Sequence, residues 1–320
     1  MAAAAAATTA AASAAAHAAA GGAALRFVTY NVRRFTDDDG ESTVAQVARS
    51  LRALQPSFVC LNEVDLDKRP GALEAVAEAL GGFHVEFFGH VKGKEGFDKY
   101  GNALLSRLPP TGSERTHLDG GFMGEHNGQP YRIHRGMLAV DFALPGSGPA
   151  LRVAVTHLDH ISEAERRVQL EHVVSRLPPS VTTVVMGDLN ALTRSDYTDG
   201  EWGALERRNA EAGWDPPAAG CLSLLSAAGF ADAFEAAHGQ DGQGLAALAE
   251  PGGAHRWTAH VDHPIYRIDY LWHRAAEGLG PQQVRVSDAF VGLEAVDSDH
   301  YPLVVDLVVS EAGEGDCAAL

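Results

Sequence analysis

Val181-Thr182-Thr183-Val184-Val185-Met186-Gly187-Asp188-Leu189-Asn190 is the stretch of this chain that says most about its fold. The β-branched and apolar run 181–186 predicts a buried strand. A carboxylate, Asp188, and a carboxamide, Asn190, follow directly at the end of that strand. Because residues i and i+2 of an extended segment point the same way, we expect both side chains to meet one ligand. Oxygen-rich pairs of this kind suit a hard divalent cation and a phosphate, although Asp and Asn are also ordinary turn residues.

Other predicted strands carry similar polar side chains where they begin or end. Each has an ordinary explanation, because a loop acid, an edge histidine or a turn residue is common at such positions. Asp269 is harder to explain in this way, since it lies between Ile268 and Leu271 and a buried carboxylate needs a partner. Together these residues indicate one shared site rather than coincidence: Asn31, Glu63, Asn102, His157, the Asp188 and Asn190 pair, Asp269, and Asp299 with His300.

The rest of the chain alternates strand-like and helix-like patterns. Ser162 begins one predicted helix with Glu165 at its third position, which is the pattern of a capping box. Helical crossovers and direct strand-to-strand steps both occur, which favours two packed mixed sheets covered by helices in one domain. The predicted strands are 25–32, 56–64, 83–88, 103–106, 136–144, 151–157, 181–186, 266–273, 284–286 and 303–309, and the main helices are 43–54, 72–80 and 162–177.

Composition narrows the class of protein. The chain has 320 residues, of which 46% are hydrophobic, so it can bury a sizeable core. The formal net charge of −17 argues against a protein that coats nucleic acid through a broad basic face. It does not exclude an enzyme that approaches a polyanion locally, since a bound cation reverses the sign of the field at the site.

The cysteines and the two ends of the chain bear on compartment and domain limits. Three scattered cysteines form neither a disulfide framework nor a metal-ligand spacing, which favours a reducing, intracellular compartment, cytoplasmic or nuclear. Residues 1–24 predict a disordered Ala-rich tail without the features of a secretory signal, with organelle targeting as the alternative. We expect a domain over 25–310 with a loop-rich insert at about 191–256, a mobile Gly-rich part at 238–255, and a flexible acidic tail over 311–320. Outside the alanine tract no segment predicts a membrane span.

This ordered set of motifs resembles the endonuclease/exonuclease/phosphatase superfamily, which has the DNase-I-like fold. The most specific matches are Gly187-Asp188-Leu189-Asn190 and Ser298-Asp299-His300-Tyr301-Pro302, and the resemblance runs from about Leu25 to Val309. It implies an α/β protein built as a four-layered α/β sandwich, with two mixed β-sheets packed face to face and flanked by helices. It also implies cleavage of phosphate esters with Mg²⁺ or Mn²⁺ as cofactor.

The resemblance implies a role for each matching residue. Asn31, Glu63 and Asp299 would hold the metal ion, and hard oxygen ligands suit that task. Asp188 would position or deprotonate the attacking water, and Asn190 would hydrogen-bond a phosphate oxygen.

The histidines would act on the phosphate itself. Asp269 would accept a hydrogen bond from His300 and favour its imidazolium form. His157 would be a second donor to phosphate or a general acid for the leaving oxygen. Three further residues are candidates for substrate binding: Arg33, Asn102 and Arg135.

The substrate is less determined than the chemistry. Nucleic acid, DNA or RNA, is the leading class of phosphate-ester substrate, although the acidic charge and the scarcity of basic clusters weaken it. A smaller phosphoester such as an inositol phosphate, a nucleotide or a phospholipid head group is the alternative, and no basic amphipathic helix supports the lipid. A non-catalytic binding domain of the same fold is a further alternative, which the complete acid, amide and histidine set disfavours. We expect a monomer.

Overall fold

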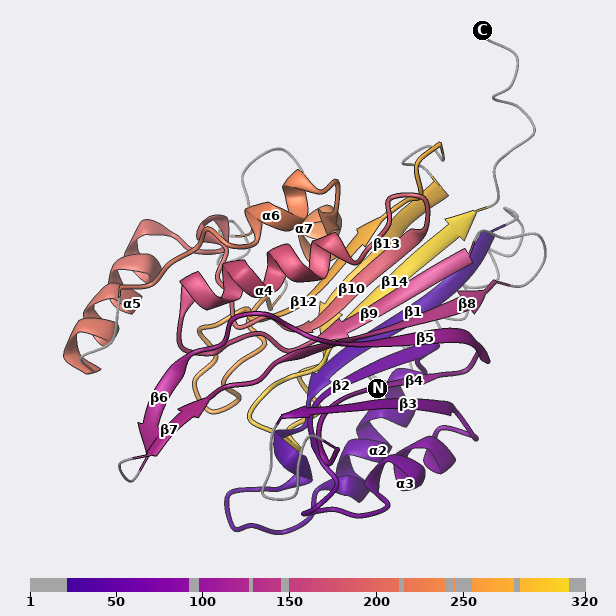
Figure 1. The fold of residues 1–320 in the computed structure, drawn as a ribbon, viewed down its shortest axis with the longest axis horizontal. Coiled ribbons are helices and arrows are strands. Elements are labelled where there is room, and N and C mark those ends of the chain that lie inside the picture. Colours follow the sequence, from indigo (N-terminus) through magenta and orange to yellow (C-terminus); the bar gives the residue numbers. More distant parts are fainter. Residues whose placement is uncertain are drawn as a thin grey trace, which may run out of the picture.

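The computed structural model of this protein describes residues 22–91, 98–126, 129–144, 150–212, 216–239, 245, 255–278 and 283–310. Within these ranges the chain forms two six-stranded sheets and one two-stranded hairpin (Figure 1). The first sheet has the order β13 (Val284–Val291), β14 (Leu303–Ser310), β1 (Gly22–Asn31), β2 (Phe58–Asp65), β4 (Tyr100–Ser106), β3 (His84–Val91). The second has the order β11 (Ala231–Asp232), β12 (Asp269–Arg274), β10 (Thr182–Asp188), β9 (Ala150–Thr156), β8 (Gly136–Ala143), β5 (Pro110–His117).

Both sheets are mixed, as the sequence predicts. β1 runs parallel to β2, and β9 runs parallel to β10, while the other pairs within these sheets are antiparallel. The parallel pairs are connected by helices, because a parallel pair needs a crossover that returns the chain to the same end. Helix α2 (Val44–Leu54) makes the crossover from β1 to β2, and α4 (Glu163–Ser175) makes the one from β9 to β10.

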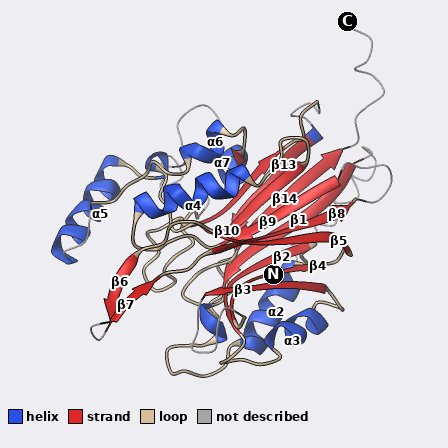
Figure 2. Cartoon of the chain, in the orientation of Figure 1, coloured by secondary structure: helices blue, strands red, loops and turns tan. Residues whose placement is uncertain are grey.

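The sheets pack face to face and helices cover their outer faces, which confirms the four-layered α/β sandwich (Figures 1 and 2). Helices α2 and α3 (Ala72–Ala79) share a hydrophobic cluster with the first sheet. Helices α4 and α6 (Ser223–Ala227) do the same on the second sheet. The largest cluster lies between the sheets, where it excludes water from the strands that carry the site.

The side chains of β1 alternate between the two faces of the first sheet, and both faces are covered. Leu25 and Phe27 point into the cluster between the sheets, whereas Val28 and Tyr30 point toward the helices. Successive side chains of a strand face opposite sides, so a strand covered on both faces is mostly apolar. Strand β1 begins at Gly22, three residues earlier than predicted, because 22–24 pair with the last residues of β14.

The N-cap of α4 is confirmed, but the reciprocal half of the capping box is replaced: the Ser162 N–H donates to Asp159, and the Glu165 carboxylate accepts from the Gly121 N–H. The Ser162 side chain accepts a hydrogen bond from the Glu165 backbone N–H at 3.4 Å. Ser162 itself lies in extended backbone, and the helix begins at Glu163. This cap fixes where the chain turns after β9, directly beside the polar residues that follow that strand.

The sequence reading missed several elements. The edge strand β5 is polar, with no apolar alternation to reveal it, and pairs only with β8. The hairpin of β6 (Met123–His126) and β7 (Gln129–Arg132) projects from the body, so burial leaves no pattern in it (Figure 1). β11 and α7 (Ala233–His238) are too short for a periodic signal. β12 begins at Asp269 rather than 266, because Tyr266 forms an isolated bridge with Ala259.

The predicted insert contains regular structure where it is described. A 3-10 turn, η2 (Arg194–Asp196), leads into the helix α5 (Asp199–Ala212). Residues 1–21, 240–244, 246–254 and 311–320 lie outside the described residues, and with them most of both predicted tails and of the Gly-rich segment. In the described part of the chain, no helix has the length and hydropathy needed to cross a bilayer.

Candidate functional site

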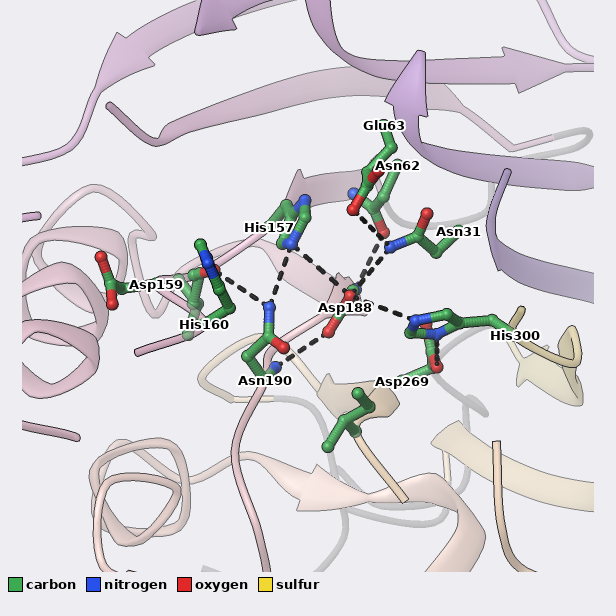
Figure 3. A network of polar contacts seen from close by, with 12 residues as sticks. Asn31, Asn62, Glu63, His157, Asp159, His160, Asp188, Asn190, Asp269 and His300 are labelled. Atoms are coloured by element: carbon green, nitrogen blue, oxygen red, sulfur yellow. Dashed lines mark hydrogen bonds and ion pairs between the residues drawn. The ribbon is translucent and has the colours of Figure 1, made fainter. Parts of the chain in front are cut away.

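The topology brings the polar strand ends together at one end of the sandwich (Figure 3). Asn31 is the last residue of β1, Asp188 is the last of β10, and His157 directly follows β9. Because β12 runs antiparallel to β10, its first residue, Asp269, pairs in register with Asp188. Packing of β1 against β10 and β12 then places residues from both sheets around one point.

Asp188 lies at the centre of the site. Its carboxylate is 2% exposed and accepts a hydrogen bond from Asn31 Nδ2 to Oδ2 at 3.0 Å. The same oxygen lies 3.5 Å from His157 Nε2 and 3.9 Å from His300 Nε2. The other oxygen, Oδ1, accepts a hydrogen bond from the Asn190 backbone N–H at 3.0 Å. One carboxylate thus connects groups from four separate segments.

Asn190 faces the same site as Asp188, but for a reason other than the one predicted. The strand ends at Asp188, and Asn190 has a φ of 49°, in the left-handed region rather than the extended one. Its side-chain amide lies 3.0 Å from His157 Nε2 and donates to the Leu158 carbonyl at 3.2 Å. A turn closed by the Asp188 carboxylate, not strand periodicity, makes the two side chains converge.

His300 and Asp269 form the pair that the buried carboxylate required. His300 Nδ1 lies 2.8 Å from Asp269 Oδ2, and both side chains are buried. Burial alone disfavours the charged imidazolium, but the adjoining Asp269 carboxylate outweighs it and raises the pKa of His300 to about 10. His300 is therefore positively charged at neutral pH, with Nε2 directed toward Asp188.

The Asp188 carboxylate holds its proton more tightly than an ordinary aspartate. Burial, and next the negative charge of Asp269, raise the pKa of Asp188 to about 7, while His300 opposes the shift. A carboxylate with a pKa near neutrality can accept a proton from water at physiological pH.

Glu63, Asn31 and Asp299 border this centre. Glu63 sits at a bulge in β2 with a φ of 58°, where the pairing with β4 shifts register between Leu61 and Val64. A bulge re-aims a side chain and is common beside active sites. Asn31 Nδ2 lies 3.3 Å from Glu63 Oε1. The Ser298 hydroxyl lies between Asn31 and Asp299, 2.7 Å from the Asn31 carbonyl oxygen and 3.2 Å from Asp299 Oδ1.

The chemistry of these residues fits a hard divalent cation. Their donors are carboxylate and amide oxygens, which Mg²⁺ and Mn²⁺ prefer. Asp188 and Asp269 are buried side by side, and burial, followed by the negative charge of Asp269, raises the pKa of Asp188. A nearby cation would supply positive charge beside them.

Arg135 is a buried cation next to the site. It is 6% exposed, and its guanidinium lies 3.4 Å from His157 Nδ1 and 3.2 Å from His160 Nδ1. Burial, followed by the charge of Arg135, lowers the pKa of His157 well below its usual value. His157 is therefore neutral, in contrast to His300 across the site.

The other two candidates for substrate binding lie in different surroundings. Arg33 is 40% exposed at the rim, and its guanidinium lies 2.6 Å from Asp38 and 3.8 Å from Asp299. Asn102 is buried, and its amide is hydrogen-bonded to Asn62 at 2.9 Å and to the Gly136 carbonyl at 3.4 Å. Arg33 is thus open to a ligand, whereas Asn102 lies behind the site, and both roles stay predictions.

Sequence reasoning missed Asn62, which ties the two sheets together behind the site. Its Oδ1 accepts a hydrogen bond from the Asp188 backbone N–H at 2.8 Å, and its Nδ2 donates to the Thr156 carbonyl at 3.1 Å. The sequence feature that could have identified Asn62 is a polar amide inside the otherwise apolar run of β2. Gly187 permits this close approach, because a Cβ there would lie 1.9 Å from the Thr156 carbonyl oxygen.

Arg267 was also missed as a supporting residue. It is fully buried and forms ion pairs with Asp196 at 2.8 Å and Asp232 at 2.7 Å. Coulombic attraction to these carboxylates outweighs burial and raises the pKa of Arg267 well above its usual value. The ion pairs hold η2 and β11 against the start of β12, two residues before Asp269.

Solved structures share this fold at low sequence identity. An endonuclease/exonuclease/phosphatase from Beutenbergia cavernae matches with a TM-score of 0.64 at 23% identity, covering 90% of this chain and 72% of that one. D. rerio TDP2 complexed with a single-strand DNA product matches with a TM-score of 0.55 at 18% identity, covering 89% and 99%. The human Nocturnin catalytic domain with a bound sulfate anion gives 0.57 at 18%, covering 89% and 93%.

No curated protein matches the chain in a sequence comparison. The family model described as "Endonuclease/Exonuclease/phosphatase family" matches residues 28–300, which include Glu63, the Gly187–Asn190 stretch and His300. The fold, the placement of these residues and this match agree, and the chain belongs to the endonuclease/exonuclease/phosphatase family.

Proposed function

We propose that this protein is a divalent-metal-dependent hydrolase of phosphate esters, with Asp188 as its central base. The observation that carries the proposal is the position of this one buried carboxylate. It contacts a charged histidine, His300, and a neutral one, His157, while Asn31 and Asn190 donate hydrogen bonds to it. Membership of a family that is generally hydrolytic on phosphate esters supports the same reading.

Asp188 would orient the attacking water and take up its proton. A base works best when its pKa lies near the working pH, and the pKa of Asp188 is about 7. The hydrogen bonds from Asn31 Nδ2 and the Asn190 backbone N–H hold the carboxylate in one orientation. Fixing the base in this way lowers the entropy that the reaction must lose.

The histidines and Asn190 would hold the phosphate. His300, kept as imidazolium by Asp269, would donate from Nε2 to a nonbridging oxygen where negative charge develops. The Asn190 amide would donate to a second oxygen. His157, neutral and close to Arg135, would donate a hydrogen bond to phosphate. Acting as a general acid for the leaving oxygen would require the imidazolium form, which burial and Arg135 disfavour.

Glu63, Asn31 and Asp299 would hold the metal ion. When bound, the ion supplies Lewis-acid polarisation of a phosphate oxygen and stabilises the charge of the transition state. Mg²⁺ and Mn²⁺ both suit these oxygen donors.

Nucleic acid is the leading substrate class in this proposal. The D. rerio TDP2 structure contains a single-strand DNA product, which supports it by analogy of fold. At the site itself, Arg33 at the rim and the buried Arg135 offer positive charge to a phosphate. The net charge of −17 favours a substrate with local contacts, such as a strand end or a small phosphoester, over a long duplex.

The test is turnover of bis(p-nitrophenyl) phosphate by the purified full chain with Mg²⁺ or Mn²⁺, followed by a panel of DNA, RNA, nucleotides and inositol phosphates. We expect metal-dependent turnover that EDTA removes and that Asp188→Asn lowers by roughly 10²–10³-fold. Folded protein with no turnover on any substrate would overturn the proposal and favour a binding domain of the same fold.

A further inference from the structure

His260 lies beside the proposed metal site, and no motif in the sequence pointed to it. Its Nδ1 lies 3.8 Å from Asp299 Oδ2. One ligand atom from each of His260, Asp299 and His300 falls within 4.8 Å of the others. His300 is protonated and bonded to Asp269, so His260 and Asp299 are the donors available among these three. Two ligands of one octahedral ion with bonds of about 2.1 Å lie between about 3.0 and 4.2 Å apart, and the separation of 3.8 Å falls within these limits.

The backbone holds the His260 segment firmly against the Asp299 segment. The Val261 N–H donates to the Asp299 carbonyl at 2.9 Å, and the Tyr301 N–H donates to the Thr258 carbonyl at 2.7 Å. Ala259 forms bridges to both Tyr266 and His300. His260 is therefore held by backbone hydrogen bonds to the segment that carries Asp299.

Ring packing restricts the imidazole as well. The His260 ring meets the Tyr266 ring edge to face at 5.9 Å and the His300 ring at 6.0 Å. Its side chain is 49% exposed, so the ring is accessible to solvent. A histidine that is restrained, accessible and directed toward a carboxylate has the properties of a metal ligand.

We propose that His260 is a further ligand of the ion at Asp299, and that it makes the site select Mn²⁺ over Mg²⁺. Mg²⁺ strongly prefers oxygen donors, whereas first-row transition ions also accept imidazole nitrogen and bind mixed nitrogen and oxygen sites more tightly. The inference rests on the proposed function only in placing the ion near Glu63, Asn31 and Asp299. It adds a nitrogen donor that oxygen chemistry alone does not predict.

The test measures binding, independently of catalysis. Mn²⁺ and Mg²⁺ affinities of the full chain are determined by calorimetry and by competition, and pulsed EPR of bound Mn²⁺ detects directly coordinated ¹⁴N. We expect Mn²⁺ to bind at least ~10-fold more tightly than Mg²⁺. His260→Ala should weaken Mn²⁺ binding by roughly tenfold, leave Mg²⁺ binding almost unchanged and remove the ¹⁴N coupling assigned to this ring.

Two further variants make the outcome specific. His260→Asp replaces the nitrogen donor by an oxygen donor, and we expect it to bring the Mg²⁺ affinity close to the Mn²⁺ affinity. His263→Gln is the matched control, because His263 is an exposed histidine three residues away and should leave both affinities and the EPR signal as they are.

Failure of the His260 inference and failure of the phosphoesterase proposal give different results. Mn²⁺ binding and ¹⁴N coupling that persist in His260→Ala would overturn the role of His260 and leave the phosphoesterase proposal intact. A chain that binds neither ion and turns over no phosphate ester would overturn both.

Discussion

Single residues in unusual backbone conformations shape this site. Glu63 and Asn190 both have positive φ values, of 58° and 49°. Such conformations are costly for residues other than glycine, and they cluster where function requires them. Gly187, with a φ of 141°, is the glycine that lets β10 approach the end of β9. These three positions aim the carboxylate of Glu63 and the amide of Asn190 at the common centre.

The charge of His300 depends mainly on Asp269, with further contributions from Asp188 and Asp299. In Asp269→Asn the largest of these contributions is lost while burial still disfavours the imidazolium, and we expect the pKa of His300 to fall well below about 10. Phosphodiesterase activity at pH 7.5 should then fall by roughly 10²–10³-fold. NMR titration of the imidazole checks the pKa directly. A pKa of His300 that stays near 10 in this variant would contradict the assignment.

His90 should make the free energy of unfolding sensitive to acid. Burial, together with the charge of Arg135, lowers the pKa of His90 to about 3. The folded state therefore favours the neutral ring, so its stability is complete above pH 6.5 and declines as pH falls from there toward 3. The expected loss for one such proton is about 1.4 kcal/mol per pH unit.

Urea unfolding at pH 7 and pH 5 checks this sensitivity. In His90→Gln the pH dependence of the free energy of unfolding should correspond to about one proton fewer than in wild type, because glutamine does not titrate. His84→Gln, an exposed position on the same strand, should keep the wild-type dependence. Equal slopes in wild type and His90→Gln would show that other groups cause the acid sensitivity.

Buried polar contacts, as well as the hydrophobic core, hold the secondary-structure elements in position against one another. Asp159, fully buried after β9, accepts hydrogen bonds of 2.9 Å each from the backbone N–H groups of Phe122, Ile161 and Ser162. It thereby joins the base of the projecting hairpin to the start of α4. Arg267 does the same for η2 and β11 against β12, using charge instead of backbone amides.

Arg267→Met should destabilise the fold by about 3–5 kcal/mol, because it leaves Asp196 and Asp232 as buried carboxylates without their cation. Urea denaturation monitored by tryptophan fluorescence checks the size of the loss. Combining it with Asp196→Asn and Asp232→Asn should recover part of that stability, since neutral amides no longer repel each other and Asn still caps α7. A triple variant less stable than Arg267→Met would show that lost packing, not charge, dominates.

At the scale of the whole molecule, the site is a concentration of negative charge between two sheets. The raised pKa of Asp188 means that its contribution to stability is present below pH 4 and is lost as pH rises through about 7. A cation bound at the same place offsets that loss. Metal binding and global stability are therefore linked through the charged end of the sandwich.

Metal ions should raise the unfolding temperature, and more so at pH 8 than at pH 5. At an ion concentration of 100 times Kd the expected gain is about 2.7 kcal/mol. EDTA should reverse it, and Glu63→Gln should reduce it, because one oxygen ligand loses its charge. Differential scanning calorimetry with and without the ion checks the effect. An equal gain in Glu63→Gln would exclude Glu63 as a ligand.

The sequence by itself determined the sandwich and most of the residues at its polar end. Runs such as Thr182–Met186 consist of β-branched and apolar residues because both faces of the strand are buried, and this local pattern can be recognised in the sequence. The family motifs located Asp188, Asp269 and His300, because Asp188 ends one recognisable strand, Asp269 begins another, and His300 lies three residues before a third.

Only the tertiary structure decided how these residues meet. Asn62 acts across the gap between the sheets, Arg267 joins segments about 70 and 35 residues away, and His260 reaches Asp299 through backbone pairing of distant loops. No periodicity or residue spacing in the sequence marks these contacts, because each of them depends on which strand ends lie opposite each other in the folded chain. The sequence sets which chemical groups reach the end of the sandwich, and packing of the two sheets sets their distances, charges and partners.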